Sequence, residues 1–207
     1  MEQQVVAAAL AMIQPTTDSQ TRSAASLFLE QWTRTPEAWD IYLSWLQSFH
    51  SSKGSTEELG MSMLCLTLLQ SKIRREIHRT TSPSQTLQAI RQLLLELLDT
   101  SPSLLTNPLC ACITAISARL GHVKEVVDMC TLSIPTTITT TTTISAKQLK
   151  VLGALPQELE ACGELTTPQV TAELWPHMER VLDFVRRALA MEELTIMAAL
   201  ECLRYVH

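Results

Sequence analysis

The sequence predicts an all-α protein built from antiparallel helix pairs. Hydrophobic residues make up 46% of the 207 positions, whereas aromatic residues make up 4% and glycine occurs five times. This composition is typical of helices rather than of a β-sandwich. Apolar residues also recur at helical spacing, and capping residues followed by proline separate the apolar runs.

The first part of the chain shows several helix-start signals. Thr35 stands before Pro36, and Ser55 and Ser82 are each followed three residues later by Glu or Gln, as in a capping box. The segment 56–79 carries one apolar stripe, which consists of Leu59, Met63, Leu66, Leu69, Ile73 and Ile77. We therefore predict helices over residues 2–14, 19–34, 36–49, 56–79 and 83–99.

The same signals continue in the rest of the chain. Asn107–Pro108 and Thr167–Pro168 each place a capping residue before proline, and a long apolar stripe follows the second pair. The predicted helices cover residues 108–120, 122–132, 145–160, 168–190 and 192–206. The segment 136–143 reads TTITTTTT, and because β-branched threonine disfavours a helix we expect an exposed loop at 134–144.

The helix pairs repeat about every 40 residues, which is within the range of HEAT-type repeats. We therefore expect about five antiparallel pairs stacked as a solenoid in a single block over residues 1–207. Apolar residues stay in phase up to Tyr205 and Val206, whereas the terminal repeats of a solenoid normally have a polar outer face. The sequence therefore resembles a fragment of a longer solenoid.

Charge and cysteine content limit the class of protein. The net charge is -5, whereas a general nucleic-acid binder is usually basic, so we predict no direct nucleic-acid partner. No apolar run reaches the ~18 residues of a transmembrane helix, and the first residues do not resemble a signal peptide, so no membrane partner is expected. The six cysteines form no CxxC pair, which indicates reduced, buried thiols.

Motifs for chemistry are weak. The sequence contains no GxSxG, HExxH or glycine-rich phosphate loop, and its five histidines lack metal-ligand spacing, so no metal or cofactor is predicted. Cys110 and Cys112 would point about 200° apart on a helix, which does not suit joint binding of one metal. The tryptophans are expected to pack between helices: Trp32, Trp39, Trp45 and Trp175. A binding protein is the favoured class, and an enzyme with a cysteine nucleophile is a weaker alternative.

The segment 25–41, ASLFLEQWTRTPEAWDI, resembles the first repeat of the importin-β superfamily, and most of all its transportin-SR and importin-thirteen branch. The matching residues are Ala25, Phe28, Leu29, Thr35, Pro36, Ala38, Trp39, Asp40 and Ile41. The basic segment 69–79, LQSKIRREIHR, is similar to a later motif of that branch through Leu69, Lys72, Ile73 and Arg74. The segment 152–159, LGALPQEL, resembles a further stretch. Residues 1–100 would correspond to the importin N-terminal region and 101–207 to further repeats.

The resemblance implies a nuclear transport receptor that shuttles between cytoplasm and nucleus. Its expected partners are the Ran GTPase in its GTP form, Phe-Gly nucleoporins and protein cargo, including Arg/Ser-rich splicing factors. The residues that would face Ran are Gln70, Lys72, Arg74 and Arg75. Basic residues in the last turn of a helix are also favourable to the helix dipole without any partner. A HEAT-type scaffold that never binds Ran is therefore the main alternative.

Overall fold

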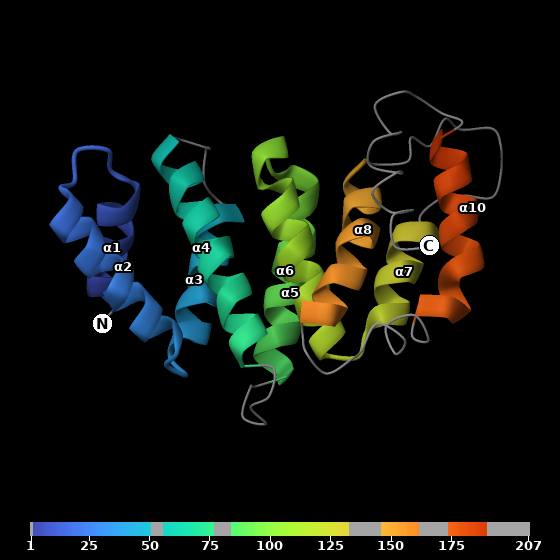
Figure 1. The fold of residues 1–207 in the computed structure, drawn as a ribbon, viewed down its shortest axis with the longest axis horizontal. Coiled ribbons are helices and arrows are strands. Elements are labelled where there is room, and N and C mark those ends of the chain that lie inside the picture. The colour runs from blue at the N-terminus through green and yellow to red at the C-terminus, as the bar shows by residue number, and fades with distance from the viewer. Residues whose placement is uncertain (1, 51–55, 77–83, 133–145, 162–173, 190–207) are drawn as a thin grey trace. The chain divides into compact units, whose positions relative to one another are not determined.

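The computed structural model describes residues 2–50, 56–76, 84–132, 146–161 and 174–189 (Figure 1). Every regular element within these ranges is helical, which confirms the predicted all-α class. The chain divides into two compact units, Met1–Cys112 and Ile113–His207, which are described separately below. Among the described residues, none of the helices has the length and apolar character needed to cross a membrane.

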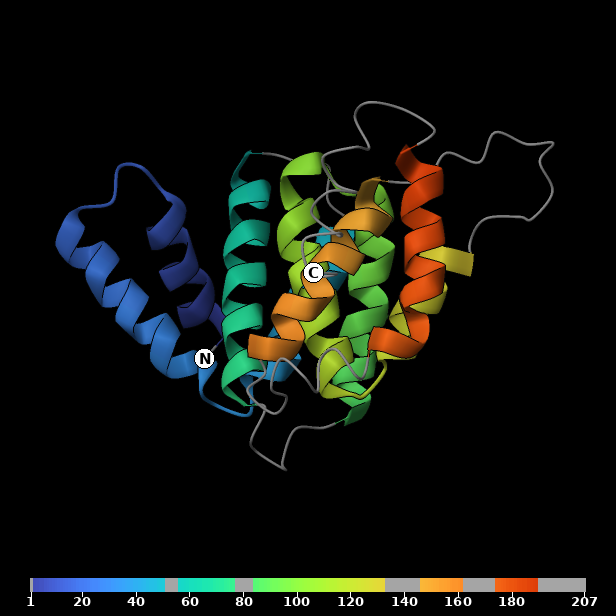
Figure 2. The same cartoon turned by 45° about the vertical axis from the view of Figure 1, so that its right-hand side comes forward.

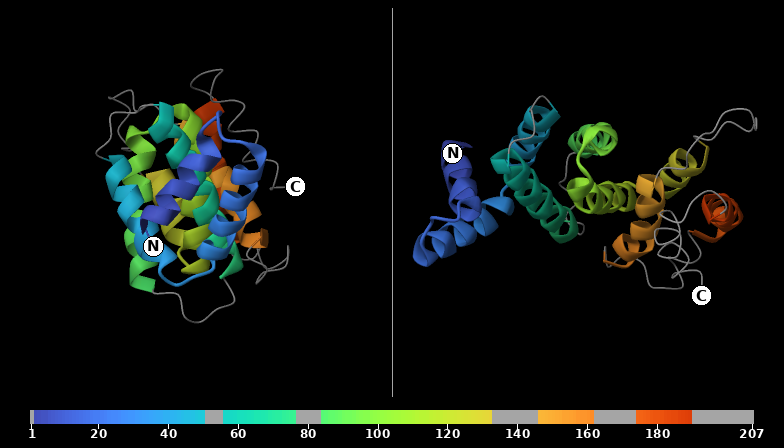
Figure 3. Two further views of the ribbon diagram at one scale, coloured as in Figure 1. Left: turned by 90° about the vertical axis from the view of Figure 1, so that its left-hand side faces the viewer. Right: turned by 90° about the horizontal axis from the view of Figure 1, so that it is seen from above.

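The first unit begins with α1 (Glu2–Ile13), α2 (Ser19–Thr33), α3 (Ala38–His50), α4 (Thr56–Arg75) and α5 (Ser84–Thr100). The short helix η1 (Ser103–Leu105) and the start of α6 (Thr106–Arg119) follow. Helix α1 packs against α2 and α4, while α3 packs against α4 and α5. Figure 2 shows that the loop after α1 turns the chain back, so that α1 and α2 run antiparallel, and the right-hand view of Figure 3 shows α3 and α4 side by side. Both pairs consist of helices that follow one another along the chain.

Helix α2 begins at a side-chain cap. The Asp18 carboxylate accepts hydrogen bonds from the Thr21 backbone N–H at 2.9 Å and from the Thr21 hydroxyl at 2.7 Å. These two bonds, the hydroxyl bond most strongly, lower the pKa of the Asp18 carboxyl. The cap satisfies an N–H that the first turn would otherwise leave without a partner.

Aromatic side chains fill the junction between α2 and α3. The Trp32 ring centroid lies 5.1 Å from that of Tyr42 and 6.0 Å from that of Trp45. The hydroxyl groups of Tyr42 and Thr33 lie 3.2 Å apart within hydrogen-bonding distance, and burial raises the pKa of Tyr42. Trp39 is also buried, so the prediction that the tryptophans pack between helices is confirmed for the three in this unit.

The second unit contains the end of α6, followed by α7 (Val123–Leu132), α8 (Ala146–Ala161), η2 (Trp175–His177) and α10 (Met178–Leu189). Helix α7 packs against both α8 and α10. An ion pair between Arg180 of α10 and Asp128 of α7 joins two of these helices. Val185 of α10 is buried, in agreement with the predicted apolar stripe, and Phe184, which that stripe does not include, is buried as well.

A Schellman motif ends α6. Gly121 has φ +69°, and its N–H donates to the Ala118 carbonyl while the His122 N–H donates to the Ser117 carbonyl. These two bonds are the pair that defines the motif, and the positive φ favours glycine because it has no Cβ.

Several boundaries differ from the prediction. Helix α3 begins at Ala38 rather than at 36, because the chain first forms a turn in which Ala38 and Trp39 donate to the carbonyls of Thr35 and Pro36. The predicted helix 168–190 is interrupted by the 3-10 turn Trp175–His177, after which α10 begins at Met178, and the first six residues of the predicted helix, 168–173, lie outside the described residues. Trp175 is 69% exposed, so the expectation that it packs between helices is wrong. The predicted loop 134–144 and helix 192–206 lie outside the described residues.

Candidate partner-binding surface at the end of helix α4

Helix α4 carries all four residues that the resemblance implicates in binding a partner. Glu57 and Glu58 occupy its first turn, and Lys72, Arg74 and Arg75 occupy its last turn, so both ends have the charges that the helix dipole favours. Its buried stripe consists of Ser62, Cys65, Leu66, Leu69, Lys72 and Ile73. The inclusion of Lys72 in this stripe is the unusual feature, because lysine is rarely fully buried unless it is paired.

The Lys72 ammonium holds the end of α2 against α4. Its Nζ donates to the carbonyl of Thr33 at 2.9 Å and to that of Thr35 at 2.8 Å. Both carbonyls lie at or just beyond the last turn of α2, where backbone acceptors have no partner within the helix. Lys72 therefore acts as a C-terminal cap that is supplied by a different helix.

Glu76 and Trp39 complete the surroundings of Lys72. The Glu76 carboxylate accepts from Lys72 Nζ at 2.5 Å and from the Trp39 indole N–H at 3.0 Å. The ammonium also lies 4.8 Å from the Trp39 ring centroid, within the range of a cation–π contact. The ammonium thus has two carbonyls, a carboxylate and an aromatic ring of the same unit around it.

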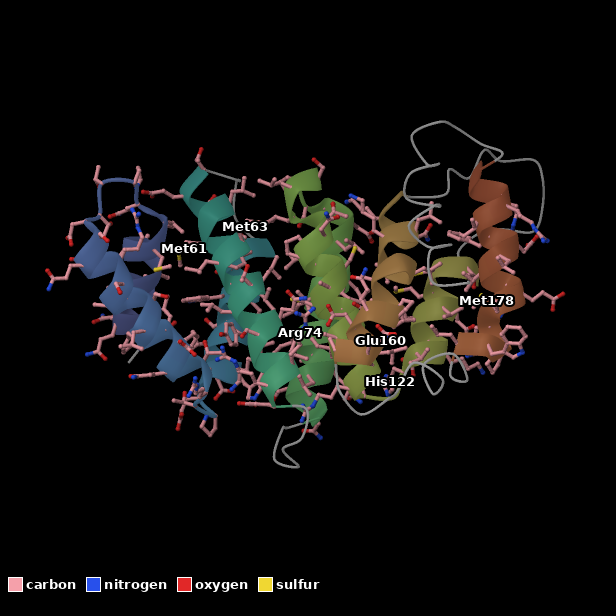
Figure 4. All side chains as sticks on the ribbon, in the orientation of Figure 1. Met61, Met63, Arg74, His122, Glu160 and Met178 are labelled. Carbon is pink, nitrogen blue, oxygen red and sulfur yellow. The ribbon has the colours of Figure 1, made fainter. Side chains whose placement is uncertain are left out.

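The four candidate residues do not form one cluster. On an ideal helix Gln70 and Arg74 are about 40° apart, and Lys72 and Arg75 about 60° apart, whereas Gln70 and Lys72 differ by about 200°. Arg74 and Arg75 are exposed and Gln70 is partly exposed, but Lys72 is buried. The structure therefore does not fit a direct surface contact for Lys72, and leaves Gln70, Arg74 and Arg75 as accessible candidates. Figure 4 places Arg74 toward the C-terminal end of α4, away from Met61 and Met63.

Arg75 takes part in a charged group that also includes α2. Glu30 Oε1 lies 2.8 Å from an Arg34 guanidinium nitrogen and 3.5 Å from an Arg75 guanidinium nitrogen. Beside it is a pocket of about 230 Å³, lined by Thr33, Arg34, Lys72, Arg75 and Glu76. We call these five residues and Glu30 the α2–α4 pocket. Glu30, Arg34 and Glu76 were not among the residues predicted from the sequence. The spacing of Glu30 and Arg34 could have indicated that pair, but sequence spacing could not show the contact with Arg75.

A second pocket lies at the other end of α4. It has a volume of about 530 Å³, and its lining consists of Ile13, Gln14, Pro15, Thr56, Glu57, Gly60, Met63, Leu64 and Thr67. Gly60, Met63 and Thr67 fall on the same side of an ideal helix as Gln70 and Arg74, and the side extends roughly 21 Å from Gly60 to Arg74. These five positions therefore share one side of α4, which Ile13 of α1 approaches at Gly60.

The thiols and acidic residues do not form a metal site within the described ranges. No group of three or more His, Cys, Asp or Glu side chains there has the arrangement needed to hold a metal ion. Cys110 and Cys112 lie on α6 as predicted, and they are buried, as are Cys65 and Cys130. Burial raises the pKa of the Cys65 thiol, which disfavours the reactive thiolate.

Comparison with known proteins adds no assignment. The chain matches no protein-family model, and a search of curated proteins finds no significant match.

Proposed function

We propose that this chain is the N-terminal part of a nuclear transport receptor of the importin-β type, and that it binds Ran in its GTP form. The resemblance of segments 25–41 and 69–79 supports the proposal, because it suggests which helices would bind. The observation that carries it is the exposed end of α4, where Gln70, Arg74 and Arg75 reach the surface of a helix packed on α3. A polar helix end of this kind suits the charged surface of a protein partner.

The receptor would work by coupled binding rather than by a chemical reaction. Binding of Ran-GTP to the N-terminal repeats and binding of cargo elsewhere would disfavour each other, and thermodynamic linkage makes this effect reciprocal. The receptor would bind Phe-Gly nucleoporins and carry protein cargo between cytoplasm and nucleus. Arg/Ser-rich splicing factors are the cargo class that the resemblance suggests.

A charge reversal in α4 tests the proposal. We expect the full chain to bind Ran loaded with a GTP analogue more tightly than Ran loaded with GDP, and Arg74→Glu/Arg75→Glu to weaken the former by roughly tenfold or more. The matched control is Arg186→Glu/Arg187→Glu, because these exposed arginines are also adjacent and also lie in the last turn of a helix. Titration calorimetry gives both affinities. Equal binding of the two nucleotide states by the folded chain would contradict the proposal.

A helical scaffold that does not bind Ran is the second candidate. The burial of Lys72 favours it, because this residue match in the basic segment is then explained by packing alone. A scaffold would show no partner whose affinity depends on the bound nucleotide. The calorimetric comparison of the GTP and GDP states therefore separates the two candidates.

A further inference from the structure

We infer that the α2–α4 pocket receives an acidic side chain of a partner protein, which takes the place of Glu30 between Arg34 and Arg75. The inference rests on the proposed function only in assuming that the end of α4 meets a protein. It adds the chemistry of the contact. It also assigns roles to Glu30 and Arg34, which are not among the residues that match the family.

The positions of Arg34 and Arg75 support this exchange. Arg34 comes from the end of α2 and Arg75 from the end of α4, and the single carboxylate of Glu30 approaches both at 2.8 and 3.5 Å. Two guanidinium groups that share one carboxylate form a site for a carboxylate, because each presents several N–H donors in a planar arrangement. Glu30 already shows that a carboxylate oxygen can lie between them.

The volume of the α2–α4 pocket suits a side chain rather than a free small molecule. Its volume of about 230 Å³ is below the roughly 300–1,000 Å³ of most small-molecule sites. Lys72 is one of its lining residues, and the ammonium is held in place by the Thr33 and Thr35 carbonyls. A lining group that is fixed in this way needs little rearrangement when a partner binds.

The local charge has the sign that an acidic side chain needs. The pocket lining contains three cationic side chains, Arg34, Lys72 and Arg75, and one anionic side chain, Glu76, which gives a formal charge of +2. The chain as a whole carries -5, so this positive region stands out from its surroundings. The carboxylate of Glu30 lowers the local charge, and it is the group that must give way.

Glu30 can give way easily because its ion pairs are exposed. The side chains of Glu30, Arg34 and Arg75 are 46%, 62% and 45% exposed. Ion pairs in such positions contribute little to stability, because water solvates both charges when they separate. An incoming carboxylate therefore replaces the two weak ion pairs of Glu30 with its own contacts to the same two guanidinium groups, and it also gains the field of the pocket.

The test compares two variants that should act in opposite directions. The probe is a fluorescently labelled oligoglutamate peptide, its control is an oligoglutamine peptide of equal length, and the readout is anisotropy with the full chain at low salt. We expect Glu30→Gln to tighten binding of oligoglutamate about threefold, because it removes the internal competitor. Arg34→Gln and Arg75→Gln should each weaken it about fivefold, because each removes a charge-assisted donor.

Helix α10 offers a matched control pair. Arg187 and Asp183 form an exposed ion pair with the same spacing and the same order along the helix as Glu30 and Arg34. Asp183→Asn and Arg187→Gln should leave the affinity for oligoglutamate unchanged. The inference is overturned if Glu30→Gln does not tighten binding, or if the α10 variants change it as much as the α2 and α4 variants do.

The same variants separate this inference from the proposed function. If oligoglutamate responds as expected while Ran binds equally in both nucleotide states, the acidic-partner site stands and the receptor proposal fails. If Ran-GTP binds selectively but oligoglutamate binding is insensitive to Glu30, Arg34 and Arg75, the receptor proposal stands and this inference fails.

Discussion

At the residue scale, Lys72 joins the basic segment of the sequence to the packing of the first unit. A buried ammonium loses its hydration, so it is tolerated only where hydrogen-bond acceptors replace the water. Here the acceptors are the Thr33 and Thr35 carbonyls and the Glu76 carboxylate, which match the three hydrogens of the ammonium. The residue therefore connects the end of α2 to α4, whatever partner the neighbouring arginines bind.

Replacing Lys72 with Met should lower the free energy of unfolding by about 3 kcal/mol, because two carbonyls and one carboxylate lose their charged donor. Lys124→Met is the matched control. Lys124 is exposed on α7, and its replacement should change the free energy by less than ~0.5 kcal/mol. Urea denaturation followed by circular dichroism gives both values. A similar small change for both variants would mean that the Lys72 network contributes little to stability.

At the element scale, two glycines show how the same residue type can have opposite roles. Gly60 lies inside α4, and a Cβ added there would meet Ile13 side-chain atoms at 3.5 Å, an ordinary van der Waals distance. Gly121 ends α6 with a φ of +69°, where a Cβ is unfavourable although nothing lies within 4 Å of it. The local backbone, rather than the available space, distinguishes the two positions.

Replacing these two glycines with alanine should therefore change the free energy of unfolding in opposite directions. Gly60→Ala should raise the free energy of unfolding by about 0.5–1 kcal/mol, because alanine favours the helix and restricts the unfolded chain. Gly121→Ala should lower it by about 1 kcal/mol, because a side chain is strained at positive φ. Each variant serves as the control for the other in thermal denaturation. Destabilisation by Gly60→Ala would instead indicate that α1 and α4 pack too closely for a methyl group.

The elements themselves could be predicted well from periodicity and caps. Stripes such as Leu66, Leu69 and Ile73 are buried as expected, because a helix with one apolar face has one favourable way to pack. The helix starts that we predicted from proline were less exact. Pro36 lies in a turn before α3, since a fixed φ suits the turn as well as the first turn of a helix.

At the scale of the whole molecule, the candidate site was harder to predict than the helices. Sequence spacing placed Gln70, Lys72, Arg74 and Arg75 on one helix, but it could not tell which side faces α2, and so it could not show that Lys72 is buried. Glu30 and Arg75 are 45 positions apart along the chain, and their contact depends on the packing of α2 against α4. The stacking of helix pairs into a HEAT-type solenoid remains part of the proposal.

Buried thiols provide a further prediction for the whole molecule, because they occur in both units. Cys65, Cys110 and Cys112 belong to the first unit and Cys130 to the second, and all four are buried. In the variant Cys162→Ser/Cys202→Ser only these four thiols remain. We expect fewer than about one-tenth of them to react with an aromatic disulfide reagent within minutes at pH 8, because reaction needs an accessible thiolate.

The direction of the pKa change strengthens this expectation for Cys65. Burial raises its pKa, so at pH 8 the thiolate fraction is smaller than for an exposed cysteine, and it grows only as the pH rises toward that pKa. Guanidinium chloride should expose all four thiols, which should then react as fast as the thiol of free glutathione. Free glutathione is measured as the control under each condition. Rapid reaction of one thiol in the native chain would reveal an accessible cysteine of low pKa. That result would favour the cysteine-nucleophile hypothesis over a protein that acts only by binding.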